Sequence, residues 1–243
     1  MSIEKERISN GGFVPKWVRR EHHARFEFAA QYVQDKIVVD CACGSGVGSK
    51  IFALAGAKQV LAYDLSADDV YSAQAGNYLS NLVYAVGEAT ALPSESGLAD
   101  VYISLETIEH LVDDAKFLVE VKRVLKPSGV FICSTPNRAV TNPRSQITDK
   151  PWNKFHTREY SYEEFENLLK KYFDSVEIFG QNSKSRWRIK ASNLIAKIFS
   201  THVAVRFNQI LKLPRLIFDS AKSREVKSIQ PDKECEYLVA VCK

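Results

Sequence analysis

Short apolar runs alternate with segments of helical periodicity along most of the chain. Apolar runs of strand length occupy 37–39, 82–86, 99–105 and 130–135, and shorter ones end at Asp64 or occupy 176–179 and 237–242. Between them we expect helices over 21–33, 47–54, 66–80, 114–125 and 160–172. Strands and helices that alternate in this way predict an α/β sheet with helices on both faces.

Capping signals support three of these helices. Ser66 with Asp69, and Ser161 with Glu164, have the spacing of a capping box. Asp113 or Asp114 precedes the helix that is expected to end at the turn 126–129.

A glycine turn follows the first strand and leads into the helix 47–54. Ser49 stands where the G-x-G-x-x-G pattern of dinucleotide folds has its third glycine, and Asp40 would repel a pyrophosphate. Asp40 would instead attract an ammonium group, and Asp64 can accept two hydrogen bonds from a ribose diol. An amine at one end and an unphosphorylated ribose at the other describe S-adenosylmethionine. The competing interpretation is a plain tight turn between strand and helix.

Composition indicates an ordinary globular domain. The chain has 243 residues, of which 26% are charged and 45% hydrophobic, enough for one α/β domain with its own core. No apolar run approaches the roughly 20 residues that span a bilayer, and residues 1–12 lack the apolar core of a secretory signal, so we expect a cytoplasmic protein. Five cysteines without C-x-x-C spacing indicate neither a zinc site nor a disulfide framework, and four of them lie in or beside predicted strands, where we expect small apolar fillers.

The segment Asp40-Cys-Ala-Cys-Gly44-Ser-Gly46, followed by Tyr63-Asp64-Leu65-Ser66, resembles the class I S-adenosylmethionine-dependent methyltransferases. The segments 87–93, 106–110 and 125–129 fall in that family's order, and the resemblance covers residues 20–180 approximately. It implies a single Rossmann-like domain over 1–243, with a doubly wound sheet of seven strands of which the last is antiparallel.

The resemblance also implies a cofactor site at neighbouring strand ends. Its expected residues are Asp40, Cys41, Ala42, Gly44, Ser45, Gly46, Asp64, Leu65, Glu88, Ala89 and Leu105. Arg25 lies on an N-terminal helix that covers the cofactor pocket in related enzymes. It is expected either to meet the methionine carboxylate or to lie on a solvated helix face.

The expected catalytic residues, Glu106, His110 and His156, follow the fourth and fifth strands. Glu106 would face Glu109 and His110 across one helical turn, and His156 would approach from the later loop. Glu-x-x-Glu-His with a later histidine is similar to the metal sites of polyprenyl-catechol and small-RNA O-methyltransferases. That likeness implies a Mg²⁺-like ion held by Glu106, Glu109, His110 and His156. The alternative is a histidine that acts as a base without metal.

A basic, amphipathic insert over 183–232 precedes the last strand. The insert contains eleven Lys or Arg residues and three acidic residues. Its net charge of +8 therefore exceeds the +4 of the whole chain. It is interpreted as a substrate lid with solvated charges or as a contact to an anionic membrane surface, which would place the protein peripherally at the inner membrane. Nucleic acid is disfavoured because no base-stacking platform is evident beyond Trp187 and a few phenylalanines.

The leading hypothesis is O-methylation of a hydroxyl on a saccharide or other small molecule. The segments 135–138 and 153–165 loosely resemble methyltransferases of bacterial glycan-assembly clusters. The alternatives are a lipid-linked or quinone-type catechol acceptor, an RNA terminus, and a cofactor-binding protein without catalysis.

Overall fold

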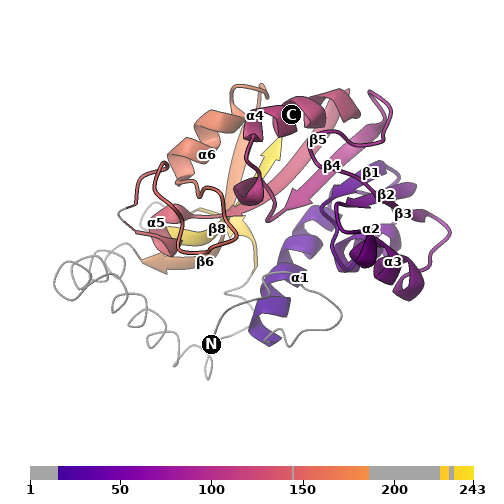
Figure 1. Ribbon diagram of the computed structural model, residues 1–243, viewed down its shortest axis with the longest axis horizontal. Coiled ribbons are helices and arrows are strands. Elements are labelled where there is room, and N and C mark those ends of the chain that lie inside the picture. The colour runs from indigo at the N-terminus through magenta and orange to yellow at the C-terminus, as the bar shows by residue number, and fades with distance from the viewer. Residues whose placement is uncertain (1–15, 144, 186–224, 230–232) are drawn as a thin grey trace.

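The computed structural model describes residues 16–143, 145–185, 225–229 and 233–243 (Figure 1). The helices are α1 (Lys16–Ala30), α2 (Val47–Leu54), α3 (Ala67–Gly76), the 3₁₀ turn η1 (Ile108–His110), α4 (Asp114–Val124), α5 (Arg138–Thr141) and α6 (Tyr162–Leu169). The strands are β1 (Ile37–Cys41), β2 (Gln59–Asp64), β3 (Leu82–Val86), β4 (Ala99–Leu105), β5 (Leu125–Pro136), β6 (Val176–Ser185), β7 (Lys227–Ser228) and β8 (Lys233–Cys242).

The strands form one sheet in the order β3-β2-β1-β4-β5-β8-β6-β7. Strands β1 to β5 pair in parallel, whereas β8 is antiparallel to both of its neighbours, β5 and β6. The expected seven-stranded doubly wound sheet with an antiparallel last strand is confirmed. The described residues add one element to it, the two-residue strand β7 beside β6.

Helices cover both faces of the sheet, as the alternation predicts. One core layer contains Phe117 of α4 and Phe165 of α6. The other contains Phe28 of α1, Phe52 of α2 and Val70 of α3. Figure 1 shows α4 and α6 on one side and α1, α2 and α3 on the other. Each layer is an apolar helix stripe buried against an apolar strand face.

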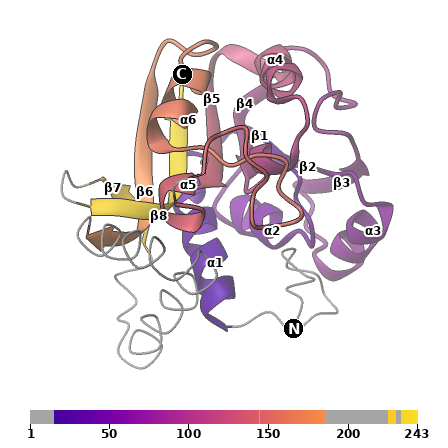
Figure 2. The same cartoon turned by 60° about the vertical axis from the view of Figure 1, so that its left-hand side comes forward.

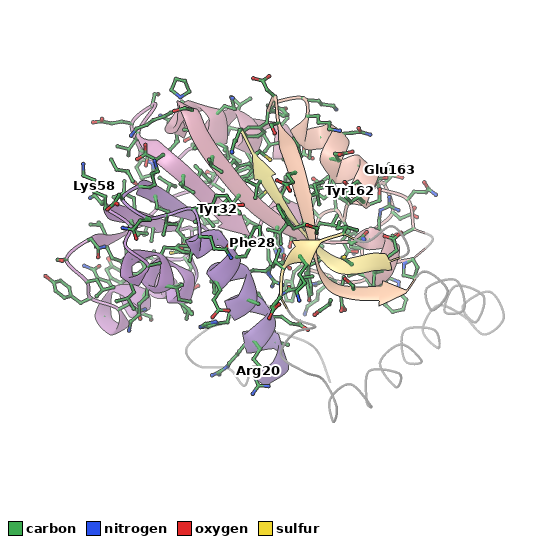
Figure 3. All side chains as sticks on the ribbon, turned by 180° about the vertical axis from the view of Figure 1, so that it is seen from behind. Arg20, Phe28, Tyr32, Lys58, Tyr162 and Glu163 are labelled. Carbon is green, nitrogen blue, oxygen red and sulfur yellow. The ribbon has the colours of Figure 1, made fainter. Side chains whose placement is uncertain are left out.

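Aromatic contacts fix α1 against the antiparallel end of the sheet. The ring centroids of Phe28 and Phe179 lie 4.9 Å apart, and Figure 3 shows Phe28 directed from α1 toward the strands. The short helix α5 lies against β8 (Figure 2). Elements from both ends of the chain, α1 and β8, therefore meet at this end of the sheet.

The predicted caps are present. Ser66 Oγ accepts a hydrogen bond from Asp69 N, and Asp113 is the capping residue of α4. Ser161 and Glu164 form both bonds of a capping box at α6. Four of the five cysteines are buried, as expected of apolar fillers, and Cys43 is half-buried.

Several boundaries differ from the prediction, and for β6 and β5 a distant partner sets the bound. β6 continues beyond 179 to Ser185, since Ser185 pairs with Lys233 at the start of β8. β5 begins at Leu125 rather than 130, because Leu125 pairs with Ala99 across an irregular step. α1 is shifted toward the N-terminus, to 16–30, and α3 ends at Gly76 rather than 80.

Most of the basic insert lies outside the described residues. Its first three residues belong to β6 and residues 225–229 contain β7, whereas 186–224 and 230–232 are not described. In the described part of the chain, no helix has the length and apolar character to cross a membrane.

Candidate active site

The glycine turn after β1 is built from residues in the left-handed region. Ala42, Gly44 and Gly46 have φ values of 64°, 52° and 74°. Gly46 precedes the first residue of α2, and a Cβ there would lie 2.3 Å from Oη of Tyr84, so only glycine fits. Gly44 has open space around its Cα, with no atom within 4 Å of an added Cβ. The turn is therefore crowded by Tyr84 at Gly46, where α2 begins, and has free space at Gly44.

Asp40 is a buried carboxyl at the end of β1. Ser49 donates a hydrogen bond of 2.6 Å to Asp40 Oδ2. Burial raises the pKa of Asp40 to about 7; the Ser49 bond offsets part of that rise and the charge of Asp64 adds to it. A cation beside Asp40 would relieve this cost, which fits the ammonium group expected from the sequence. Ser49, the residue that breaks the dinucleotide pattern, is the hydrogen-bond partner of this carboxyl.

Asp64 lies at the end of the neighbouring strand β2, which pairs in parallel with β1. Its two oxygens accept hydrogen bonds from Gly44 N at 2.8 Å and Ser66 N at 2.9 Å. An ionised carboxylate has about four acceptor positions, so each oxygen can still accept from a ribose hydroxyl. The next residue, Leu65, is 67% exposed and offers an apolar surface beside this carboxylate.

The remaining expected cofactor residues flank these two strands. Cys41 ends β1, Ser45 is buried in the turn, and Leu105 ends β4. Glu88 is exposed after β3 and accepts a hydrogen bond from the hydroxyl of Thr90, and the half-buried Ala89 packs against the core. Because parallel strands end at the same edge of the sheet, all of these residues lie along one edge.

Glu106 follows β4 in a left-handed conformation, with φ of 53°. Ser134 Oγ donates to Glu106 Oε1 at 2.6 Å, and Glu106 N donates to the Ser134 backbone oxygen at 3.1 Å. The 3₁₀ turn η1 begins only at Ile108, so Glu106 is not on a helical turn with Glu109 and His110. The prediction that one helical turn aligns these three residues is wrong. A non-glycine residue held at positive φ is strained, and such residues are concentrated at functional sites.

Glu109, His110 and His156 are brought together. One ligand atom from each lies within 4.8 Å of the others, and the two imidazole centroids are 4.9 Å apart. Backbone hydrogen bonds connect the turn η1 to the loop that contains His156. Thr157 N and Arg158 N both donate to the backbone oxygen of Glu109, at 2.8 and 3.2 Å. The predicted approach of His156 to His110 is therefore confirmed, whereas Glu106 is outside this group.

The tautomer of His110 follows from its partner. Its Nδ1 lies 2.9 Å from the backbone oxygen of Phe155, which can only accept, so Nδ1 carries a proton. In the neutral ring Nε2 is then unprotonated. Phe155, whose backbone oxygen makes this contact, is 42% exposed, and so is Trp152, three residues earlier in the same loop.

Arg25 is 1% exposed and lies beside Glu106. Its guanidinium donates to Gln181 Oε1, stacks 4.4 Å from the ring centroid of Tyr237, and has Nη2 3.9 Å from Glu106 Oε2. The alternative that Arg25 lies on a solvated helix face is wrong, because α1 buries it against β6 and β8. Its contact with a methionine carboxylate stays a prediction.

The chain is similar to known methyltransferases in sequence and in fold. The methyltransferase domain family matches residues 39–133. A probable S-adenosylmethionine-dependent methyltransferase of Mycolicibacterium smegmatis is 35% identical over 153 residues, 63% of this chain and 57% of that protein. A solved S-adenosylmethionine-dependent methyltransferase of Thermotoga maritima, a possible histamine N-methyltransferase, superposes with a TM-score of 0.60 at 17% identity, covering 93% of this chain and 92% of that one.

Residues 39–133 thus match a methyltransferase domain, and the fold is that of the solved S-adenosylmethionine-dependent methyltransferase. A ubiquinone biosynthesis O-methyltransferase of Cereibacter sphaeroides is more distant, 34% identical over 110 residues, 44% of this chain and 43% of that protein. The chain thus spans less than two thirds of the length of either curated relative. The name of the Mycolicibacterium relative gives S-adenosylmethionine as its methyl donor and does not give its acceptor.

The matched segment of the chain contains the expected cofactor residues from Asp40 to Leu105 and also His110. His156, Arg25 and the insert lie outside it. The sequence reasoning missed two polar residues of the site, Ser134, which holds Glu106, and Glu159, which lies 2.7 Å from His156. The sequence contains one weak signal of the contact between Glu159 and His156, since the two residues are three positions apart.

Proposed function

We propose that this methyltransferase transfers the methyl group of S-adenosylmethionine to a hydroxyl of a saccharide or other small-molecule acceptor. The observation that carries the proposal is the pair of imidazoles, with centroids 4.9 Å apart, beside the strand edge that holds Asp40 and Asp64. β4 neighbours β1 in parallel, so the histidine-bearing turn and the glycine turn are at adjacent strand ends.

On the donor side, S-adenosylmethionine supplies a methyl group on a positively charged sulfur. Asp40 would hold its ammonium group and Asp64 its ribose, and the exposed face of Leu65 suits the adenine. The glycine turn allows the ligand to approach the backbone at Gly44. These residues bind and orient the donor, which is the main contribution a protein makes to a displacement of this kind.

On the acceptor side, a hydroxyl must lose its proton as the new bond to carbon forms. An unprotonated imidazole Nε2 can accept that proton, and imidazole has an unperturbed pKa of about 6.5, close to working pH. The half-exposed aromatic rings of Trp152 and Phe155 suit the apolar face of a sugar or an aromatic ring. The O-methyltransferase relative further supports oxygen as the methyl acceptor.

A divalent ion is the second candidate for the histidine cluster. Glu109, His110 and His156 offer one oxygen and two nitrogen donors within 4.8 Å of one another, a set that suits zinc or manganese better than magnesium. Such an ion would draw the acceptor hydroxyl toward the methyl group and lower its pKa. Glu106, the fourth expected ligand, instead accepts a hydrogen bond from Ser134 and lies beside the guanidinium of Arg25.

Replacement of His110 tests the proposal. We expect His110→Ala to lower turnover by about 10²–10⁴-fold while cofactor affinity changes little, because a base acts only on the acceptor proton. His23→Ala is the matched control, an exposed histidine of α1 paired with Glu27. The assay follows labelled methyl transfer to nucleotide-activated sugars, polyprenyl-linked saccharides, catechols and short RNA, with and without a chelator.

The outcomes separate the alternatives. Loss of activity with chelator and its recovery with one divalent metal would support the ion, whereas indifference to chelator would leave the histidine base. Transfer confined to catechols or RNA would contradict the saccharide acceptor. Cofactor binding without transfer to any acceptor class would favour a non-catalytic binding protein.

A further inference from the structure

A buried carboxylate, Glu159, lies directly behind His156. Its Oε1 is 2.7 Å from His156 Nδ1, and both side chains are 3% exposed. The second oxygen accepts a hydrogen bond of 2.7 Å from Thr141 Oγ1, so both oxygens of the carboxylate are fixed. Arg138 Nε donates to the backbone oxygen of the same residue at 3.2 Å.

The opposite nitrogen of His156 has a defined partner as well. Asn153 Nδ2 lies 3.0 Å from His156 Nε2. The orientation of the Asn153 amide follows from its other end, because Phe155 N donates to Asn153 Oδ1 at 3.1 Å. The amide group facing the imidazole is therefore the NH₂, which can only donate.

These contacts determine the protonation pattern of the ring. A donor at Nε2 requires that nitrogen to be unprotonated, and an acceptor at Nδ1 requires that nitrogen to carry the proton. Both partners favour the same tautomer. His110 reaches the same arrangement through the Phe155 backbone oxygen, so the two imidazoles, 4.9 Å apart, are both held with an unprotonated Nε2.

We propose that Glu159 is a positioning residue, which holds His156 in the Nδ1–H tautomer, so that Nε2 accepts from Asn153 and the ring keeps its place 4.9 Å from that of His110. The inference rests on the proposed function for its use, but the tautomer itself does not depend on any acceptor. A carboxylate behind an imidazole also makes the distal nitrogen more basic, and removal of such partners typically costs about 10–100-fold in activity or metal affinity.

The first test is nuclear magnetic resonance of ¹⁵N-histidine-labelled protein without ligand, at a pH where the rings are neutral. The chain has five histidines, and His156→Gln assigns the resonance. We expect wild type to show the Nδ1–H tautomer at His156 and Glu159→Gln to keep it, because the amide oxygen still accepts. Glu159→Ala is expected to shift the ring toward the Nε2–H form.

The second test measures methyl transfer to whichever acceptor responds to the enzyme. We expect Glu159→Gln to lose about tenfold in kcat and Glu159→Ala more, with the KM for the cofactor unchanged. Glu163→Gln, an exposed carboxylate of α6, is the control and should behave as wild type. An Nε2–H tautomer in wild type, or full turnover in Glu159→Gln, would overturn the proposal even if Glu159→Ala fails to fold. A correct tautomer in a protein that methylates no acceptor would refute the proposed function alone.

Discussion

At the scale of single residues, Asp40 carries a cost in stability that its proposed contact with the cofactor's ammonium group would offset. Burial raises its pKa from 3.8 to about 7, so between these values the folded chain keeps a proton that the unfolded chain has lost. The contribution of Asp40 to stability therefore falls as pH rises through this window, and the full cost is present above pH 7.

Asp40→Asn should remove that cost. We expect the variant to be more stable than wild type at pH 8, by up to about 4 kcal/mol, and to gain almost nothing at pH 4. Urea unfolding without cofactor at both pH values measures it. Asp100→Asn is the control with the opposite expected sign. Burial acts to raise the pKa of Asp100, but hydrogen bonds from Lys126 and Ile37 N outweigh burial and lower that pKa. Asp100→Asn should therefore destabilise the protein at pH 8. A pH-independent effect of Asp40→Asn would contradict this account.

At the scale of elements, variants in the glycine turn between β1 and α2 can distinguish an effect on folding from an effect on cofactor binding. Gly44 and Gly97 both have positive φ, 52° and 66°, and both leave open space for a Cβ. We expect either glycine-to-alanine change to cost about 1–2 kcal/mol of stability. Only Gly44→Ala should also weaken cofactor binding, by at least about tenfold, because its methyl group enters the space beside Asp64. Equal cofactor affinity in the two variants would show that the turn does not contact the ligand.

Elements with strong local signals could be predicted from sequence, and those defined by distant partners could not. The helix 47–54 and the strands 82–86 and 99–105 have the predicted bounds, because capping residues, glycine and β-branched runs act within a few positions. The long β6 and the early start of β5 depend on pairing with β8 and β4. The short helix α5 has the capping residue Asn137, but its four residues are too few to show a helical period.

The same division applies to the site. Asp40 and Asp64 could be found because each ends a recognisable strand, and His110 because it follows one closely. The burial of Arg25 against Gln181 joins residues 156 positions apart, and the position of Glu106 depends on Ser134 in the next strand. Contacts of this kind are created by the sheet order and leave no trace in local spacing.

At the scale of the whole molecule, the site assembles from four regions of the chain at one edge of the sheet. β1 and β2 bring Asp40 and Asp64, β4 and η1 bring Glu106 to His110, the loop before α6 brings His156, and α1 brings Arg25. The proposed donor residues from Asp40 to Leu105 lie within the segment matched by the family, residues 39–133, whereas Arg25 and His156 lie outside it. We therefore expect related chains to share the donor and to differ in the acceptor.

Calorimetric titration with S-adenosylmethionine tests the central claim most directly. We expect saturable binding to wild type, unchanged binding to Asp68→Ala, an exposed acid of α3, and binding at least about tenfold weaker to Asp64→Ala. That factor is what the loss of a charged hydrogen-bond acceptor costs. No heat with wild type, or equal affinity in Asp64→Ala, would contradict the assignment of this strand edge as the cofactor site.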